Sequence, residues 1–543
     1  METITIYIGG TAHRIPYEAP RTLSAFLEPY GFPMPCGGAH TCGKCKVAAY
    51  GALSPLSEAE KRLLTADEQL SNVRLACCAQ ALGGCTVHAR APENARIETA
   101  GLSAQRSDAS PFGTDGYALA VDIGTTTVAA YLVNLTHAQP METASALNAQ
   151  APYGADVIAR IARCAECGIR PLQEAILTQL DGLFTALLKR RDLDARVVRG
   201  VVLTGNTTML HLVAGLDPAG IAAAPYTPQS LFGVMESARS LFAALPPDVP
   251  VYFAPCAGAY IGGDLICALL AAAPQENELL MDVGTNGELA LITGTGILCC
   301  STAAGPAFEG AGLSHGMVAA DGAITGVSIA GDGVVVCTVA GGGAARGLCG
   351  TGAISALAAL LDCKAVDETG LLDEQYHESF PLMDGVALTQ ADIRQLQLAK
   401  AAVAAGVDSM LQAAGLAPSD LHALLLAGGF GSRIDVRSAA GIGLIPPACA
   451  PRARLRQRGR GGGLPDRVVA VCARRRRASR QARSGARSHR KRLLFRPLHR
   501  TNAVPAFLKL TFFKKKVSQK TLAGCAANSR AGTAHIQAVL RLF

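Results

Sequence analysis

Val121-Asp122-Ile123-Gly124-Thr125-Thr126-Thr127-Val128 decides the fold, because Met281-Asp282-Val283-Gly284-Thr285-Asn286-Gly287-Glu288 repeats its pattern further along the chain. In both stretches a short apolar run reaches an Asp and then turns through Gly and hydroxyl or amide side chains. This pattern is typical of a buried strand followed by a turn. One such turn alone is equally typical of an ordinary hairpin. The matched pair indicates two similar halves that face each other.

Turns of this composition suit phosphate. Gly lets backbone N–H groups approach an anion closely, Thr adds hydroxyl donors, and an Asp carboxylate holds Mg²⁺ through its water shell. We therefore expect a Mg-nucleotide between the halves, with Asp122 and Asp282 as the catalytic candidates. The nucleotide-binding candidates in the turns are Gly124, Thr125, Thr126, Thr127, Gly284, Thr285, Asn286 and Gly287.

Three more glycine-rich turns extend the predicted site. They are Gly205-Asn206-Thr207, Gly350-Thr351-Gly352 and Gly428-Gly429-Phe430. A strand that ends in Gly-Gly before a helix brings backbone N–H groups to a ligand, and here we expect the adenosine end of the nucleotide. Gly428-Gly429 alone would indicate only tight packing of a strand on a helix. Its recurrence beside the paired turns favours binding.

Charge and cysteines divide the 543 residues unevenly. Residues 451–543 hold 25 of the 50 Lys and Arg but only one of the 42 Asp and Glu, so the remaining residues have a formal net charge near −16. Overall basicity therefore does not indicate nucleic-acid binding. Eighteen Cys in a chain of this length, without a basic, apolar leader or an 18-residue apolar run, predict a soluble cytoplasmic protein with reduced thiols and no membrane anchor.

The N-terminal unit contains a cysteine-rich loop. Cys36, Cys42 and Cys45 follow the spacing C-x5-C-x2-C on a glycine-rich stretch, and Cys77 lies further on. This spacing is close to that of plant-type [2Fe-2S] proteins. A structural zinc site is the alternative, but such sites usually use two C-x2-4-C knuckles. Cys78 and Cys85 compete with Cys77 for the place of the fourth ligand.

These features predict an α+β unit followed by a two-lobed α/β unit. We expect the first unit at residues 1–98, with a hairpin over Thr3–Ile8 and Thr11–Pro16, and a flexible linker at 99–116. The two-lobed unit is expected at 117–450, divided into lobes of about 117–275 and 276–450, with a basic tail at 451–543.

Together these motifs resemble the reductive activators of corrinoid proteins, which join an N-terminal [2Fe-2S] domain of β-grasp type to an ASKHA ATPase, the superfamily of acetate kinase, sugar kinases, actin and heat-shock chaperones. The resemblance runs from about residue 3 to Pro447. It implies Cys77, in Arg74-Leu75-Ala76-Cys77, as the fourth cluster ligand, and the short linker implies that no separate middle domain is present. The motifs that carry it are Asp122–Thr127, Asn148-x-Gln150, Tyr153–Ile158, Gly205–Met209, Asp282–Glu288, Gly305–Gly310 and Ala427–Gly431.

The resemblance implies an ATP-driven, one-electron reduction of a Co(II) corrinoid protein to Co(I), with Asp122 or Asp282 orienting the attacking water. The implied partners are a corrinoid protein, typically of a methyltransferase system, and an upstream low-potential electron donor; a homodimer is compatible with it. Two alternatives remain: a small-molecule kinase with a regulatory ferredoxin domain, and a redox-sensing ATPase that transfers no electron.

The tail after Pro447 changes composition abruptly, with alternating Arg at 452–460 and four consecutive Arg at 474–477. A basic arm that is disordered is one interpretation. A frameshift fits better. Regrouped by one nucleotide, the codons from Arg456 to Arg467 can encode Gly-Asn-Ala-Ala-Gly-Ala-Gly-Ala-Cys-Arg-Ile, and the first eight residues are the motif that the resemblance implies here.

The nucleotide sequence checks this prediction directly. We expect codons 456–467 to encode that motif in the shifted frame. Codons incompatible with the regrouping would leave the basic arm as the explanation, whereas a compatible set would mean that this chain lacks the last nucleotide-proximal element and has impaired activity.

Overall fold

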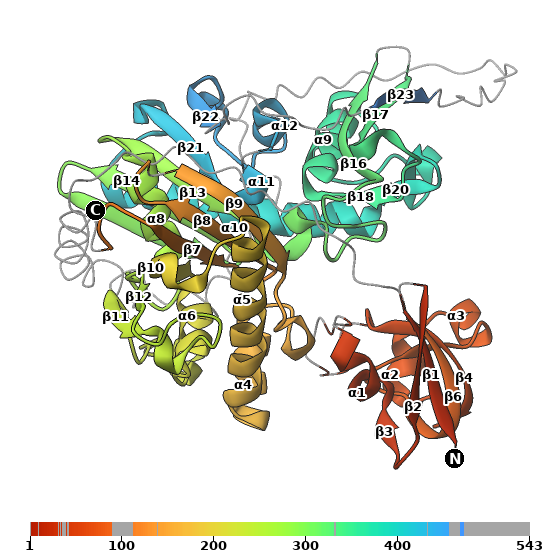
Figure 1. Cartoon of the computed structure of the whole chain (residues 1–543). Coiled ribbons are helices and arrows are strands. Elements are labelled where there is room, and N and C mark those ends of the chain that lie inside the picture. The colour runs from red at the N-terminus through yellow and green to blue at the C-terminus, as the bar shows by residue number, and fades with distance from the viewer. Residues whose placement is uncertain are drawn as a thin grey trace, which may run out of the picture.

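The computed structural model describes residues 2–89, 112–455 and 467–471, with gaps at 9, 31, 33, 35–37, 39, 41, 42, 138, 331, 332 and 432. Most of the predicted linker (99–111) and most of the tail (456–466 and 472–543) lie outside the described residues. The described residues form an N-terminal unit, drawn in red in Figure 1, and a larger unit of two halves.

The N-terminal unit is a mixed sheet with the strand order β2-β1-β6-β4-β5, and β3 pairs with β6. The central pair β1 and β6 is parallel, whereas β1–β2 is the predicted antiparallel hairpin. Alternate residues of β1, such as Ile4 and Ile6, are buried against α1. The elements are β1 (Thr3–Ile8), β2 (Thr11–Pro16), β3 (Arg21–Thr22), α1 (Leu23–Leu27), β4 (Lys46–Leu53), α2 (Glu58–Leu63), α3 (Ala66–Leu70), β5 (Val73–Leu75) and β6 (Gln80–Ala89).

The first half is built on a sheet in the order β11-β12-β10-β7-β8-β9. Strands β7, β8 and β9 are antiparallel neighbours, β10 runs parallel to β7, and β12 runs parallel to β10. One face is covered by α4, α5 and α6, which share a buried core with the sheet. The elements are β7 (Tyr117–Ile123), β8 (Thr127–Asn134), β9 (Gln139–Leu147), α4 (Val157–Cys167), α5 (Arg170–Arg190), β10 (Val198–Gly205), α6 (Thr207–Ala214), α7 (Ala219–Ala222), β11 (Val234–Ser237) and β12 (Pro250–Phe253).

The second half repeats this connectivity in a sheet of order β15-β14-β13-β21-β22. Strands β13, β14 and β15 are antiparallel neighbours, β21 runs parallel to β13, and β22 runs parallel to β21. The matched turns Gly124–Thr126 and Gly284–Asn286 therefore follow the corresponding strands β7 and β13. The strands are β13 (Glu278–Val283), β14 (Gly287–Thr293), β15 (Gly296–Thr302), β21 (Ala423–Ala427) and β22 (Ala453–Leu455). The structure confirms the predicted pair of similar lobes.

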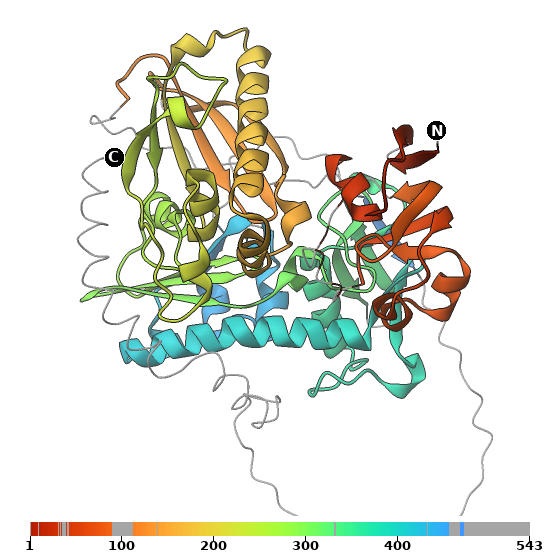
Figure 2. The same cartoon turned by 90° about the horizontal axis from the view of Figure 1, so that it is seen from below.

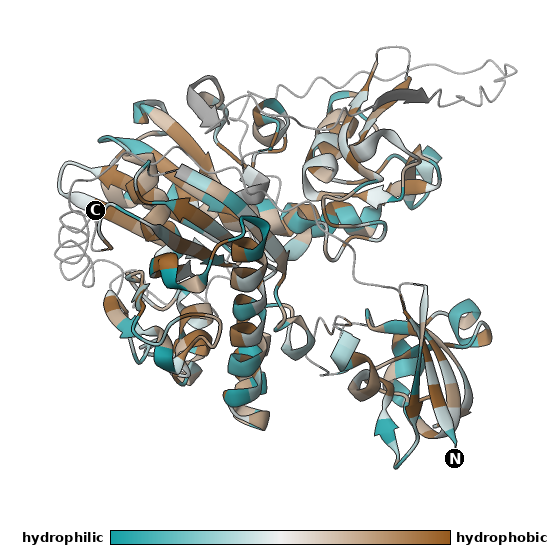
Figure 3. Ribbon diagram, viewed as in Figure 1, coloured by the Kyte–Doolittle hydropathy of each residue, from teal (hydrophilic) through white to brown (hydrophobic). Residues whose placement is uncertain are grey.

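Helix α8 (Gly263–Ala272) lies where the halves join. Its residues Leu265, Ile266 and Leu269 share a buried cluster with Leu280 and Leu425 of the second sheet. The helix follows the first half in sequence but packs on the second, so it holds the halves together. Figure 3 shows the apolar residues concentrated in the strands of the central sheets.

The remaining elements of the second half surround its sheet. The long helix α10 (Gln390–Ala414) spans the base of Figure 2, and its N-terminus carries the predicted capping box of Thr389 and Asp392. Among the described residues, no helix is long and apolar enough to cross a membrane. The other elements are β16 (Ala323–Ile329), β17 (Val335–Val339), β18 (Gly347–Leu348), α9 (Gly350–Asp362), β19 (Ser379–Met383), β20 (Val386–Thr389), α11 (Gly428–Gly431), α12 (Val436–Gly441) and β23 (Arg467–Val471), which pairs with β17.

Candidate functional site

The two predicted turns meet at one carboxylate. Glu309 ends the short 3-10 helix η5 (Pro306–Glu309) and accepts hydrogen bonds from both halves. The Thr126 hydroxyl donates to its Oε2 at 2.8 Å. The Thr285 backbone N–H and hydroxyl donate to its Oε1 at 2.8 and 2.9 Å. The structure therefore brings the matched turns together, as the repeat predicts.

The first turn is also held by amide side chains of its own half. Asn206 Nδ2 donates to Thr125 Oγ1 at 3.0 Å, and Asn206 Oδ1 caps α6 by accepting from Met209 N–H. Asn148 Nδ2 donates to the Gly124 carbonyl at 2.7 Å. The predicted candidates Gly205, Asn206 and Thr207 therefore adjoin Gly124–Thr127, as expected for parts of one site.

The glycine-rich turn after β21 adjoins Asp282. Gly428 has φ +80°, and a Cβ at this position would lie 2.2 Å from Asp282 Oδ1, so only Gly fits there. Gly429 and Phe430 follow in α11, and the Phe430 side chain lies outside the described residues. In the second turn, Asn286 accepts a backbone hydrogen bond from Gly284 and precedes Gly287 of β14.

Gly350 and Gly352 have a packing role that explains their residue type. A Cβ on Gly350 would lie 1.7 Å from the Phe308 carbonyl, and one on Gly352 would lie 2.1 Å from the Ile324 carbonyl. Thr351 donates to the Thr325 carbonyl. Gly350 therefore packs against η5, which carries Glu309, whereas Thr351 and Gly352 pack against β16.

Four carboxylates gather between the halves: Asp122, Asp264, Asp282 and Glu288. Desolvation by the surrounding protein is the main cause that raises the pKa of Asp122 and of Asp282 to about 6, and the Asp122 charge adds to the shift at Asp282. Desolvation and the Asp122 charge raise the pKa of Asp264 to about 7. Desolvation and the charges of Asp264 and Asp282 raise the pKa of Glu288 well above its usual value. Asp122 nevertheless keeps an exposed surface. Desolvation and an exposed surface occur together when a carboxylate faces solvent between two densely packed lobes, where a cation can reach it.

Arg160 is the largest buried charge of the first half that sequence reasoning did not identify. Its side chain is 1% exposed and donates to the carbonyls of Thr125 (2.5 Å) and Gly154 (2.9 Å) and to Gln150 Oε1 (3.3 Å). Burial lowers its pKa to about 9, and Asp156 opposes the shift. Arg160 therefore supports the first turn from below and supplies positive charge there.

The sequence analysis also assigned no role to two carboxylates of the site, Asp264 and Glu288. Asp264 follows Gly262-Gly263, and a Cβ on Gly262 would lie 2.5 Å from Asp264 Oδ1 and 2.4 Å from the Asn206 Cα. The Gly262 backbone N–H also faces Glu288 and opposes the rise in its pKa. The available signal for Asp264 was the strand, Gly-Gly and helix pattern, which was applied at Gly428 but not here.

In the N-terminal unit, the Sγ atoms of Cys45 and Cys77 are 3.3 Å apart. Their shared hydrogen bond lowers the pKa of the Cys45 thiol to about 7 and raises that of Cys77. Two buried sulfurs at this distance suit ligands of one metal centre, which binds thiolates. Cys36 and Cys42 lie outside the described residues.

The position of Cys77 is held by a buried ion pair. Glu60 accepts from Arg74 Nε at 2.9 Å, from Arg74 Nη2 at 3.1 Å, and from the Leu75 N–H at 3.1 Å. Both charged side chains are buried. The Arg-Leu-Ala-Cys stretch is thereby fixed to α2, and Ala76 N–H bonds to the Cys45 carbonyl at 2.8 Å.

The rivals of Cys77 lie differently. The Cys78 sulfur is 3.6 Å from that of Cys77, and ligand atoms of His40, Cys77 and Cys78 lie within 4.8 Å of one another. Cys85 is buried in the core of the unit on β6. The contact with Cys45 favours Cys77 as the fourth ligand.

The N-terminal unit touches both halves beside the paired turns. Glu28 lies against Tyr153, and burial together with the Glu28 charge raises the Tyr153 pKa to about 12. Lys44, next to Cys45, reaches the loop after η5: its Nζ is 3.7 Å from the position of a Cβ on Gly312. Lys44, the residue before Cys45, therefore lies close to the segment that follows Glu309.

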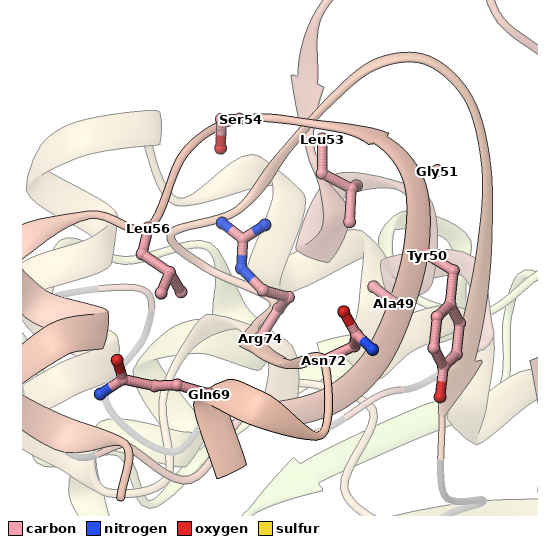
Figure 4. A pocket seen from close by; sticks show the side chains of 9 residues that line it. All are labelled: Ala49, Tyr50, Gly51, Leu53, Ser54, Leu56, Gln69, Asn72 and Arg74. Carbon is pink, nitrogen blue, oxygen red and sulfur yellow. The ribbon is translucent and has the colours of Figure 1, made fainter. Parts of the chain in front are cut away.

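Figure 4 shows a pocket of about 360 Å³ on the N-terminal unit, formed between β4 and the α3–β5 segment. Its lining includes Tyr50, Gln69 and Arg74, and Arg74 is already paired with Glu60. All lining residues belong to the N-terminal unit, so this pocket is not the site between the lobes.

Paired halves of this topology with a ferredoxin-type unit before them define an iron–sulfur protein of the ASKHA class. Family models support each part: the 2Fe-2S iron-sulfur cluster binding domain matches residues 6–82, the RACo middle region matches 117–276, and the C-terminal ASKHA domain of RACo matches 276–483. Two of these models describe regions of RACo, and together they match residues 117–483 of this chain. The prediction that no middle domain is present is wrong, because the middle-region model matches the first half.

Known relatives are named for corrinoid chemistry. The chain is 34% identical over 364 residues to the corrinoid activation enzyme RamQ of Eubacterium limosum, covering 61% of this chain and 60% of that protein. It is 26% identical over 363 residues to the [Co(II) methylated amine-specific corrinoid protein] reductase of Methanosarcina barkeri, covering 61% and 66%. The matches thus span less than two thirds of either relative.

A solved structure of a reductive activator for corrinoid, iron-sulfur protein matches 83% of this chain and 90% of its own length, at 27% identity and a TM-score of 0.57. The ferredoxin domain supports a [2Fe-2S] cluster in this chain.

Replacement of single cysteines tests the fourth ligand. We expect Cys77→Ser to lose the visible absorption and most of the iron of the reconstituted full chain, because Cys77 contacts Cys45. Cys78→Ser and Cys85→Ser are the matched controls and should keep both. Loss in Cys78→Ser with retention in Cys77→Ser would assign the ligand to Cys78.

The gathered carboxylates predict a pH-dependent stability. Because their pKa values are raised on folding, the stability they contribute is fully present below pH 3.8 and is lost as pH rises through about 6 to 7. In EDTA at pH 8, Asp264→Asn should therefore raise the free energy of unfolding by about 1 kcal/mol or more. The gain should narrow towards pH 5, as measured by urea unfolding. Asp408→Asn, on the exposed face of α10, is the control, and an equal gain in both variants would contradict the prediction.

Proposed function

We propose that this protein is an ATP-dependent reductive activator that transfers one electron from its [2Fe-2S] cluster to a Co(II) corrinoid protein and so restores Co(I). The observation that carries the proposal is the combination, in one chain, of the Cys45–Cys77 centre with two lobes whose turns meet between four carboxylates. The names of the relatives support the same substrate class.

The proposed cluster ligands are Cys36, Cys42, Cys45 and Cys77. A bound [2Fe-2S] cluster supplies or accepts one electron at a time. The chain's own contribution is to fix the sulfurs: the Glu60–Arg74 pair anchors the stretch before Cys77, and the Ala76 N–H ties it to Cys45. Rigid ligands limit the reorganisation that accompanies electron transfer.

The proposed nucleotide site uses the paired turns. Thr125, Thr126 and Thr285 present hydroxyl and backbone donors for phosphate oxygens, and Gly428 leaves room beside Asp282. Asp122 and Asp282 suit Mg²⁺ through its water shell, since a cation would relieve their mutual repulsion. One of them also orients the attacking water.

ATP drives the transfer by changing how the halves close. A nucleotide and its products bind different closures with different affinity, and that difference can be coupled to the affinity for a third molecule. The N-terminal unit contacts the first half through Glu28 and the second through Lys44. Closure of the halves therefore also moves the N-terminal unit, which holds the cluster. Hydrolysis thereby drives an otherwise unfavourable reduction of Co(II).

The proposed setting is the cytoplasm. The corrinoid partner would belong to a methyltransferase system, because Co(I) is the methyl-accepting state. A low-potential donor upstream would return the cluster to its reduced form after each turnover, which balances the electron given to cobalt.

Anaerobic visible spectroscopy tests the proposal. The reduced protein, mixed with a Co(II) corrinoid protein, should convert the Co(II) spectrum to that of Co(I) only when Mg-ATP is present. Asp122→Ala and Asp282→Ala should each lower ATP hydrolysis and corrinoid reduction by about 100-fold or more, because a phosphoryl-transfer site depends on its metal and water ligands.

Asp408→Ala is the matched control and should retain both rates. If both site variants kept full ATPase and reduction rates, the site assignment would be wrong. Phosphorylation of a sugar or a carboxylic acid without any change in the corrinoid spectrum would instead establish a kinase.

A further inference from the structure

Glu309 occupies the place where the two lobes are joined. Thr126 of the first half and Thr285 of the second both donate to its carboxylate, one to each oxygen. A Cβ on Gly284 would lie 3.2 Å from Oε1, so the side chain lies directly against the second turn. In the structure, this carboxylate links the matched turns across the lobes.

The donors that hold Glu309 are of the type that a phosphate group uses. A backbone N–H and two Thr hydroxyls, converging from two glycine-containing turns on one anionic group, form an anion-binding arrangement. A carboxylate and a phosphate both accept charge-assisted hydrogen bonds from such donors. They cannot both take the same hydrogens, and their negative charges repel each other.

We propose that Glu309 is an anionic stand-in that bridges the lobes in the ligand-free protein and is displaced by a nucleotide phosphate. The proposal rests on the proposed nucleotide site and adds a competitor to it. Displacement breaks the link from Thr126 through Glu309 to Thr285, and the phosphate then accepts from both turns in its place. Interlobe closure thereby comes to depend on the nucleotide.

The local backbone allows the side chain to move without unfolding its support. η5 is flanked by Gly305 and Gly310, both with positive φ, and Gly305 N–H bonds to the Thr285 carbonyl at 2.9 Å. Gly350 packs against the Phe308 carbonyl behind the helix. The backbone of η5 is thus anchored, and rotation of the Glu309 side chain alone vacates the turns.

Binding of a non-hydrolysable Mg-ATP analogue to the full chain tests the displacement. Glu309→Ala should bind it about tenfold more tightly than the wild type in calorimetry, because the competing hydrogen bonds and the repelling charge are both removed. Glu309→Gln keeps an acceptor oxygen but loses the charge, so its affinity should lie between. Glu368→Ala, an exposed glutamate of the same half, is the matched control and should match the wild type.

Hydrogen exchange of the Thr285 amide gives a second readout that does not depend on affinity. Without nucleotide, this amide should exchange faster in Glu309→Ala than in the wild type, and the analogue should restore protection in both. Unchanged affinity and unchanged exchange in Glu309→Ala would overturn the displacement while leaving the nucleotide site intact. Absence of analogue binding by the wild type itself would overturn the nucleotide site and the displacement with it.

Discussion

Concentration of negative charge between two facing lobes is the constraint on which the rest of the structure depends. Each half carries an Asp one residue before the end of its first strand, so bringing the halves together sets Asp122 and Asp282 near each other and near Asp264 and Glu288. Desolvated like charges are costly, and the protein responds by raising their pKa values. A cation between the lobes would remove this cost, and this supports the proposed site for Mg²⁺ and a nucleotide.

The positive charge that offsets these carboxylates within the protein is that of Arg160, which lies beneath the first turn. Arg160 is buried without a carboxylate in its hydrogen-bond set and bonds to carbonyls and an amide instead. Its charge therefore remains available to phosphates or carboxylates above Thr125, in a medium where Coulomb interactions are strong. Removal of such a buried cation would affect the turn and the charge balance together, so geometry and electrostatics are coupled in the first half.

Local sequence patterns were sufficient to predict the secondary-structure elements and the glycine-rich turns. They were not sufficient to predict which side chains meet between the two halves. The repeat of Asp-x-Gly-Thr predicted the two similar halves, and the Thr389–Asp392 pattern predicted the start of α10. Glu288 and Glu309 stood inside recognised motifs without an assigned role, because their significance arises only when the halves face each other. Arg160 has no local signal at all: an Arg on a helix is usually exposed. Gly350 and Gly352 resembled phosphate-binding residues, yet contacts with distant backbone account for them.

The similarity of the two halves predicts which structure should follow β22 in the tail. In the first half, β12 leads through a glycine-rich segment to Asp264 and α8, and α8 covers Leu280, Ala290 and Leu425 of the second sheet. The corresponding positions of the first sheet, by strand register, are Ala120, Tyr131 and Val202, which are only half-buried.

By the same symmetry, β22 corresponds to β12 and should lead through a glycine-rich segment to a helix over those residues. Regrouped by one nucleotide, codons 456–467 can encode a Gly- and Ala-rich segment at that place, whereas the present frame encodes an arginine-rich one. Symmetry therefore supports a frameshift independently of the family motif.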